Sequence, residues 1–337
     1  TALCVGPKID YVAVQSYNAY TGQPITVVLA KALLNAHFNP KAAELKLEDY
    51  KAGDKLVPFK VIAEYKGPDL VGMEYEQLIP WVNPGEGAFR VILGDYVTTE
   101  DGTGIVHIAP TFGADDAQVA KAAGIPPLQL VNKKGELRPM VDLTGKFYTL
   151  DELDEDFIKQ RVNVDLYKEY AGRFVKNAYD PNLSDQDESL DVSICMMMKV
   201  NNQAFKIEKH VHNYPHCWRT DKPVLYYPLD SWFIRSTACK ERMIELNKTI
   251  NWKPESTGTG RFGKWLENLN DWNLSRSRYW GTPLPIWRTE DNSDEKCIES
   301  VEELYNEIEK SVAAGYMQSN PYKDKGFVPG EYNEENY

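Results

Sequence analysis

Apolar and polar residues alternate along several short segments in the first two-thirds of the chain. Residues 10–17 (DYVAVQSY) show the alternation most clearly, and a period of two residues predicts a strand with one buried face. Other strand-like segments come in pairs around polar or glycine-containing turns, at 61–65 and 70–75, 89–97 and 104–109, 128–131 and 137–141, and 193–200 and 204–209. The second pair favours a hairpin or a closely paired loop. Many short strands joined by tight turns are typical of a barrel or a sandwich.

Helical patterns interrupt these strands. The predicted helices cover residues 115–123, 153–170, 237–246 and 261–269, and another follows the capping-box pair Ser300 and Glu303. Tryptophan becomes frequent after residue 210, so we expect a domain boundary at 201–215. The chain is therefore expected to be α+β. A β-barrel-like domain with peripheral helices should cover residues 1–208, and a second domain, ending in an irregular tail from 319, should cover 209–337.

The composition narrows the class of protein. With 42% hydrophobic and 26% charged residues, the chain is an ordinary globular one. Its net charge of -12 argues against a free-standing RNA-binding module, because phosphate contacts need an excess of Lys and Arg. We find no apolar run long enough for a membrane helix and no secretory signal, so we expect no membrane and a cytoplasmic location, or an organelle if a targeting segment has been removed. The five cysteines are scattered, which favours reduced thiols over disulfides or a zinc site.

The most informative stretch is GTGIVHIAPTFGADD at residues 102–116, which predicts a strand, a turn and a helix in that order. Gly102 and Gly104 allow a positive φ or a close backbone approach to a ligand. Asp116 and its neighbour Asp115 lie where the helix begins, so their carboxylates are near its positive end. A purely structural interpretation is also open: one Asp is an N-cap, the glycines form turns, and His107 belongs to the core.

The same stretch resembles the editing motif of the class I tRNA synthetases for isoleucine, valine and leucine, and the histidine with the Ala-Pro after it favours the isoleucyl family. The resemblance implies that Asp116 holds the α-ammonium of a misattached amino acid, for which a carboxylate is the natural partner. It also implies that His107 helps to hold the aminoacylated terminal adenosine, together with Gly102, Thr103 and Gly104. We therefore predict Asp116 and His107 as the catalytic pair of an editing site.

A second resemblance to this family lies near the C-terminal end, in DWNLSRSRYWGTPLPIW at residues 271–287. It implies that Trp232 and Trp280 line the amino-acid pocket of the synthetic site, where flat indole rings suit a branched aliphatic side chain. Between the two motifs, the segment from His212 to Pro223 is similar to one that binds zinc in some members through a second cysteine. Thr220 stands at that cysteine's position, so we predict no metal.

The resemblance implies an internal fragment of an isoleucyl-tRNA synthetase: an editing domain lacking its upstream threonine-rich segment, then part of an α/β nucleotide-binding catalytic domain. Neither the His-Ile-Gly-His nor the Lys-Met-Ser-Lys-Ser motif occurs. We therefore expect no cofactor in this fragment, ATP and Mg²⁺ only in the full-length enzyme, and no aminoacylation by the fragment alone.

The implied reaction is hydrolysis of valine from the isoleucine tRNA, so the expected partners are the aminoacylated 3′ end of tRNA(Ile), isoleucine and valine. An isoleucine pocket rejects valine poorly, because one methylene is worth only about 1–3 kcal/mol, a value known from this class of enzyme itself. No nucleophilic triad is evident, so a positioned water is expected to act. The alternatives are a valyl or leucyl editing fragment and a catalytically silent tRNA-binding module.

Overall fold

The computed structural model describes residues 1–184, 186–209, 211–275, 284–326 and 328. The chain divides into two compact units, Thr1–Pro228 and Leu229–Tyr337. The boundary between them falls later than the one expected at 201–215. The assignment of residues 1–208 to editing and 209–337 to synthesis is a functional division, and it stays a prediction.

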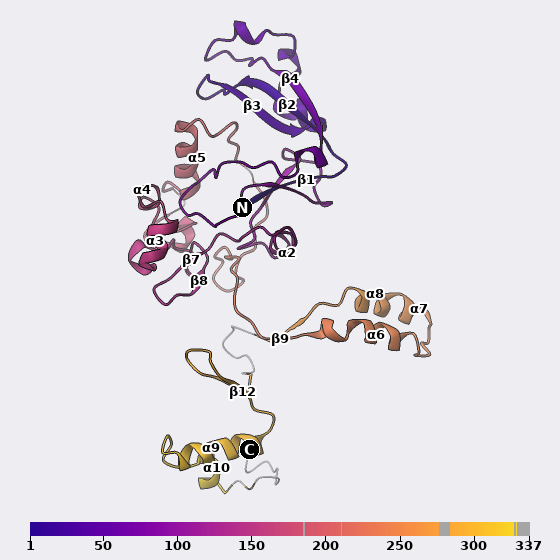
Figure 1. The fold of residues 1–337 in the computed structure, drawn as a ribbon, viewed down its shortest axis with the longest axis vertical. Coiled ribbons are helices and arrows are strands. Elements are labelled where there is room, and N and C mark those ends of the chain that lie inside the picture. Colours follow the sequence, from indigo (N-terminus) through magenta and orange to yellow (C-terminus); the bar gives the residue numbers. More distant parts are fainter. Residues whose placement is uncertain (185, 210, 276–283, 327, 329–337) are drawn as a thin grey trace. The chain divides into compact units, whose positions relative to one another are not determined.

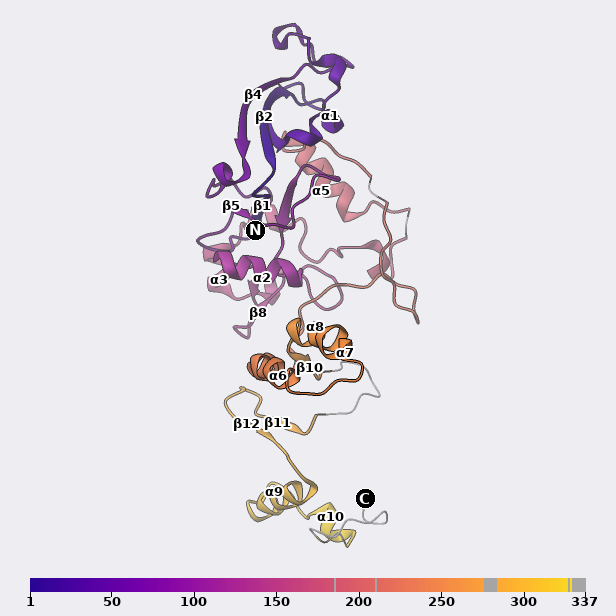
Figure 2. The ribbon, with the colours of Figure 1, turned by 90° about the vertical axis from the view of Figure 1, so that its right-hand side faces the viewer.

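The predicted strand at 10–17 is the centre of the longest sheet. It forms β2 (Asp10–Tyr17), which pairs antiparallel with β3 (Pro24–Ala30) on one side and with β4 (Lys60–Lys66) on the other. The sheet forms one end of the first unit in both views (Figures 1 and 2). Tyr11, Val12 and Val14 of β2 are buried in the core beneath it. β2 is more buried than its alternation suggested, because Tyr11, Val12, Ala13 and Val14 are all buried although successive side chains point to opposite faces of the sheet.

A second three-stranded sheet carries the motif at 102–116. Its central strand is β1 (Ala2–Val5), which pairs parallel with β5 (Val91–Leu93) and antiparallel with β6 (Ile105–Ile108). The hairpin predicted between 89–97 and 104–109 is therefore wrong. The apolar strand β1 lies between the two segments and forms backbone hydrogen bonds along both of its edges, because a buried strand needs partners for its N–H and C=O groups. The helix α2 (Ala114–Ala123) follows β6, and both views show it below this sheet (Figures 1 and 2).

Three other strand predictions are wrong, those at 193–200, 70–75 and 204–209. Residues 193–200, predicted as a strand, belong to the helix α5 (Leu190–Val200), whose N-cap Ser189 accepts a hydrogen bond from the amide of Val192. Ile194 and Met197, three residues apart, both pack on the core around Trp81, which is a helical spacing. Residues 70–75 contain the end of a 3-10 helix, a turn and one isolated bridge from Glu74 to Arg90 rather than a strand. The hairpin of β7 (Leu130–Val131) and β8 (Leu137–Arg138) is confirmed.

Mixed α and β structure with small sheets is confirmed, but the barrel-like arrangement is wrong for the residues that the structure describes. Their sheets contain two or three strands each. With the segments at 70–75, 193–200 and 204–209 not extended into strands, too few strands remain to curl into a closed barrel.

The helix predicted at 153–170 is divided in two. α3 (Glu155–Arg161) begins at the N-cap Asp154, and α4 (Val164–Tyr167) begins at the N-cap Asn163. Val162 between them is extended and bridges to Val82, which interrupts the helical hydrogen bonds. Tyr167 and Tyr170 then pack against Trp81 in the second core cluster of this unit.

The second unit contains short elements close to those predicted. Two strand pairs are β9 (Phe233–Ile234) with β10 (Trp272–Asn273) and β11 (Ile286–Arg288) with β12 (Glu295–Cys297). The helices are α6 (Lys240–Asn247), α7 (Ser256–Thr259), α8 (Arg261–Glu267), α9 (Val301–Ala313) and α10 (Pro321–Asp324).

Helix α10 falls inside the tail that was expected to be irregular. It forms there because Asn320 caps it and Pro321 occupies its first turn. A parallel nucleotide-binding sheet is not present among residues 229–275 and 284–326. That part of the expected fold stays a prediction.

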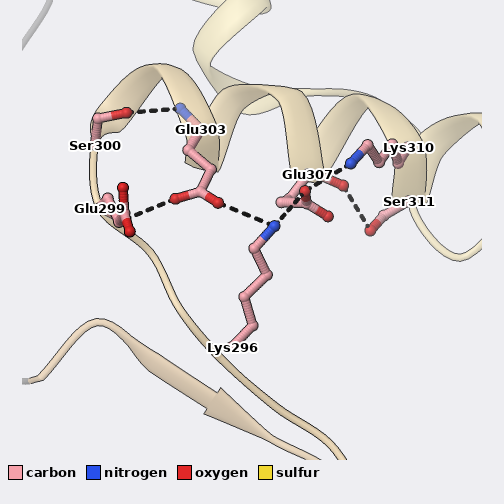
Figure 3. Close-up of polar contacts among 7 residues, drawn as sticks. All are labelled: Lys296, Glu299, Ser300, Glu303, Glu307, Lys310 and Ser311. Carbon is pink, nitrogen blue, oxygen red and sulfur yellow. Dashed lines mark hydrogen bonds and ion pairs between the residues drawn. The ribbon is translucent and has the colours of Figure 1, made fainter.

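The N-cap predicted in front of α9 is confirmed, but the reciprocal bond of a capping box goes to the residue before the cap. Ser300 Oγ accepts from the amide of Glu303, while the Glu303 carboxylate accepts from the amide of Glu299 (Figure 3). Lys296 of the β11–β12 hairpin donates to Glu303 at 3.0 Å and to Glu307 at 2.7 Å, and thereby ties the hairpin to the helix. These ion pairs are largely exposed, so their effect is on local geometry more than on stability. Among the described residues, no helix is both long and apolar enough to cross a bilayer.

Candidate functional site

The motif at 102–116 folds as the strand, turn and helix that its sequence predicted. β6 carries His107, the chain turns at residues 109–113, and α2 starts at Ala114. The helix ends at Gly124, whose φ of 66° is the left-handed conformation that glycine adopts without strain. Both aspartates lie in the first turn of α2. The helix dipole there favours negative charge.

The two aspartates differ in environment. Asp115 is exposed, whereas Asp116 is half-buried and its Oδ2 accepts a hydrogen bond of 2.8 Å from the backbone amide of Ala109. The N-cap of α2 is Gly113, so the structural interpretation of one Asp as the cap is wrong. Asp116 instead reaches back across the turn to the end of β6. Its other oxygen, Oδ1, belongs to the same fixed carboxylate and can accept further hydrogen bonds.

Gly113 explains why the carboxylate fits there. A Cβ at this position would lie 2.9 Å from Asp116 Oδ2 and 3.0 Å from Asp116 Cγ. The backbone of Gly113 has a φ of -94°, which any residue can adopt. The glycine is therefore required for the space that it leaves to Asp116, and its conformational freedom is not needed.

His107 is exposed rather than part of the core, so the interpretation of it as a core histidine is wrong. Desolvation lowers the pKa of His107, and the negative charge of Asp116 opposes this shift. Desolvation therefore favours a neutral imidazole, which can both donate and accept a hydrogen bond.

Three separate elements hold the turn at Gly102, Thr103 and Gly104 through its carbonyl groups. Ala30 N donates to Thr103 O at 2.8 Å, Tyr11 Oη donates to Gly104 O at 2.7 Å, and His37 Nε2 lies 2.7 Å from Gly102 O. Gly104, with a φ of 72°, is buried, and a Cβ there would meet the Cβ of Ala30 at 2.4 Å. Gly104 therefore serves close packing, whereas Gly102 and Thr103 are exposed.

Sequence reasoning missed four groups at this site: the Ala109 amide, Gly113, Tyr11 and His37. The spacing of the motif does not single out the Ala109 amide or Gly113, because a glycine at that position is also typical of a residue that ends a strand. Tyr11 and His37 are distant in sequence, and no sequence signal connects them to the turn. Only the pairing of β2 with β3 and the position of α1 (Leu34–His37) bring them there.

The predicted synthetic pocket is not assembled by the described residues. Trp280 lies in residues 276–283, outside the described part of the chain. Trp232 is half-buried, its amide donates to Ser275 Oγ at 2.6 Å, and the guanidinium of Arg288 lies 4.6 Å from its ring centre. This cation–π contact covers part of the indole. The role of the two tryptophans stays a prediction.

The segment with Cys217 forms a tight turn. His216 bridges to Pro223, and Cys217 N donates to Lys222 O at 2.8 Å. The side chain and amide of Thr220 hydrogen-bond the sulfur and lower the pKa of Cys217 to about 7. The described residues hold no cluster of three or more His, Cys, Asp or Glu side chains suited to a metal. The absence of a metal in the protein stays a prediction.

Comparisons with known proteins decide the family. A family model described as tRNA synthetases class I (I, L, M and V) matches residues 26–333. The chain belongs to this family. It is 80% identical to an isoleucine–tRNA ligase of Bacteroides thetaiotaomicron, and 68% and 59% identical to isoleucine–tRNA ligases of Porphyromonas gingivalis and Cytophaga hutchinsonii. These matches cover 100%, 100% and 96% of this chain, but 31%, 30% and 29% of the relatives.

This class I synthetase chain therefore spans about a third of the length of the curated relatives that it matches. The resemblance to isoleucyl-tRNA synthetases is confirmed, and the valyl and leucyl alternatives are not favoured. A solved structure described as the crystal structure of GlLeuRS-CP1 is 16% identical with a TM-score of 0.30, and covers 62% of this chain and 79% of that chain. A likeness this low carries no argument about fold or function.

Proposed function

We propose that this chain carries the proofreading site of an isoleucine–tRNA ligase. The site would hydrolyse valine from mischarged tRNA(Ile), while the whole enzyme attaches isoleucine to the same tRNA with ATP and Mg²⁺. The observation that carries the proposal is the Asp116 carboxylate, which is fixed by the Ala109 amide at the N-terminus of α2. A cytoplasmic location belongs to the same proposal.

Asp116 would receive the α-ammonium of the esterified amino acid. An aminoacyl ester carries this cation, and a charge-assisted hydrogen bond to a carboxylate is stronger than a neutral one. Because the Ala109 amide already orients the carboxylate through Oδ2, the carboxylate is preorganised before substrate binds. Asp115, exposed on the same turn, lacks this constraint and is a natural control.

His107 would contact the terminal adenosine beside the ester. A neutral imidazole offers one donor and one acceptor, which suits the hydroxyls of a ribose. The ester is cleaved by water, whose hydroxyl adds to the carbonyl carbon. The ester bond to the ribose oxygen then breaks, and that oxygen takes a proton. No residue of this chain is assigned as the general base.

The test compares Asp116→Asn with Asp116→Ala in the full-length ligase. Asparagine keeps an oxygen for the Ala109 amide and removes the charge, so it separates position from electrostatics. A hydrogen bond to a charged group is worth about 1.5–3 kcal/mol, so we expect kcat/KM for valyl-tRNA(Ile) deacylation to fall roughly 10- to 150-fold in Asp116→Asn. Asp116→Ala should abolish deacylation.

Aminoacylation with isoleucine should be unchanged in both variants, and Asp115→Asn should deacylate normally. Normal deacylation by Asp116→Asn would show that the negative charge of Asp116 does not bind the α-ammonium of the substrate. We also expect this chain alone to show only background pyrophosphate exchange, and clear exchange would contradict the view that it lacks a synthetic site of its own. If the chain binds tRNA but substitutions at Asp116 do not change hydrolysis, the catalytically silent tRNA-binding module is the better interpretation.

A further inference from the structure

The turn at residues 109–113 joins β6 to α2 and presents the Asp116 carboxylate. The amide of Ala109 donates to Asp116 Oδ2 at 2.8 Å. The carbonyl of Ala109 accepts from the amides of Phe112 and Gly113, at 3.2 and 3.0 Å. Because the same residue binds the carboxylate and the far side of the turn, a displaced Phe112 would also displace the amide that orients Asp116.

The two side chains at the tip of this turn are held differently. Thr111 is buried, and its hydroxyl donates to Leu128 O at 2.8 Å. Phe112 is 38% exposed and borders an apolar cavity of about 400 Å³, whose lining includes Leu128, Met140 and Val141. A ring beside a cavity can shift toward it, because packed atoms do not oppose the movement on that side. The position of Phe112 therefore depends on a contact from elsewhere in the chain.

Tyr227, near the end of the first unit, supplies such a contact. Its ring lies edge-on to the ring of Phe112, with 6.4 Å between the ring centres and 68° between the planes. Edge-to-face pairs are favourable over about 4.5–7 Å. Tyr227 is itself fixed, because it is half-buried against the core cluster around Trp81 and its hydroxyl donates to Val141 O at 3.0 Å. Desolvation raises the pKa of Tyr227 to about 12, so the hydroxyl keeps its proton for this bond at neutral pH.

We propose that Tyr227 is a positioning residue of the proofreading site, which holds the turn at 109–113 through the ring of Phe112 and thereby keeps the Asp116 carboxylate in place. This inference rests on the proposed proofreading function and adds to it a residue far from the motif in the chain. Tyr227 acts through Asp116 and does not touch the substrate. Its effect is therefore confined to substrates that Asp116 recognises by charge.

The test measures how well the full-length ligase distinguishes an ester that has an α-ammonium from one that lacks it. The isoleucine tRNA is charged either with valine or with α-hydroxyisovaleric acid, in which a hydroxyl replaces the ammonium and the carbon skeleton is kept. The ratio of kcat/KM for deacylation of the valyl ester to that of the hydroxy acid ester reports what the Asp116 charge contributes.

Tyr227→Ala should lower this ratio about three- to tenfold, which is within the range that an aromatic pair supplies. The fall should come from the valyl ester, while kcat/KM for the hydroxy acid ester changes by less than about twofold. An unchanged ratio would overturn the inference. An equal loss with both esters would overturn it too, because that result shows a general loss of structure in the site.

Two variants serve as controls. Tyr227→Phe keeps the ring against Phe112 and removes the hydroxyl that donates to Val141, so it should retain most of the wild-type ratio. If it behaves like Tyr227→Ala, the ring contact is not what holds the turn and the inference is wrong. Tyr226→Ala removes the adjacent tyrosine, which is exposed, and should leave the ratio unchanged. Aminoacylation with isoleucine, measured on each preparation, should be unchanged.

Phe112→Ala tests the other half of the pair, and decides the matter if Tyr227→Ala does not fold. Its side chain is partly exposed, so its removal should leave the fold intact. We expect the same fall in the ratio, and an unchanged ratio would contradict the inference. In the double variant the fall should be no larger than in either single variant, because both substitutions remove the same contact.

The two proposals fail differently. If Asp116→Asn slows deacylation of the valyl ester but neither Tyr227→Ala nor Phe112→Ala changes the ratio, the turn keeps its position without the ring pair and the proofreading function stands. If Asp116→Asn deacylates normally, the proofreading site itself is wrong and this inference falls with it.

Discussion

Replacing Gly113 with alanine would displace the Asp116 carboxylate without changing its charge. The added Cβ would lie 2.9 Å from Asp116 Oδ2, whereas ordinary contacts begin at 3.4 Å. The backbone at Gly113, with φ -94° and ψ 123°, accepts alanine without strain. The alanine therefore acts through the side chain of Asp116, and the carboxylate must retreat by roughly half an ångström.

This displacement stretches the 2.8 Å hydrogen bond from Ala109 to Asp116. A misplacement of about 1 Å at a reacting group can cost about 100-fold, so half of that should lower kcat/KM for valyl-tRNA(Ile) deacylation about tenfold. Glycine is also a better N-cap than alanine, and with the weakened hydrogen bond we expect the free energy of unfolding to fall by about 1–2 kcal/mol.

The assay is deacylation of valyl-tRNA(Ile) by the full-length enzyme, with urea unfolding measured in parallel. A double-mutant cycle with Asp116→Ala isolates the contact, because the alanine at 113 then meets no carboxylate. In the Asp116→Ala background, Gly113→Ala should cost only the loss of the cap and the 3.0 Å contact with the Cβ that residue 116 keeps. Wild-type deacylation by Gly113→Ala, or an equal stability cost in both backgrounds, would refute the reasoning.

Two other sites offer tests of packing and of electrostatics. Gly104→Ala should lower the free energy of unfolding by about 3 kcal/mol or more, because it adds a contact of 2.4 Å with Ala30 to an unfavourable positive φ. Gly102→Ala, which has open space around it, should lower the free energy of unfolding by only about 1 kcal/mol. Urea unfolding measures both, and equal costs would contradict the packing argument. The lowered pKa of Cys217 places the midpoint of its alkylation at a pH of about 7, with the thiolate present above that pH. Thr220→Val should move this midpoint upward, because it removes the side-chain hydrogen bond to the sulfur. An unchanged midpoint would show that the Thr220 hydroxyl does not lower the pKa of the thiol.

The sequence determined the local structure wherever a short stretch of residues carries its own signal. The alternation at 10–17 became β2, the glycine at 124 ended α2, and Ser300 with Glu303 capped α9. In each case the interactions join residues within a few positions of one another, so the pattern and the structure have the same physical basis. The motif at 102–116 likewise predicted strand, turn and helix in the correct order.

Short apolar segments were the ones that the sequence left ambiguous. Residues 193–200 fit a strand by composition, yet they form α5, because Ser189 caps a helix and the core around Trp81 accepts a helical face. Periodicity alone does not separate a buried strand from a buried helix at this length. The pairing of β5 and β6 through β1 was equally hidden, since strand partners far apart in sequence leave no local pattern.

The sequence by itself therefore determined the family, the order of elements around the motif and the identity of Asp116 as the residue to examine. Only the tertiary structure decided what holds that residue and what lies beside it. The Ala109 amide and Gly113 contact Asp116 within the motif, once its turn folds back, whereas Tyr11 and His37 hydrogen-bond to the turn from segments far away in the chain. Such contacts depend on how separate segments pack in space, and that packing is settled by the burial of the whole core rather than by any single stretch of sequence.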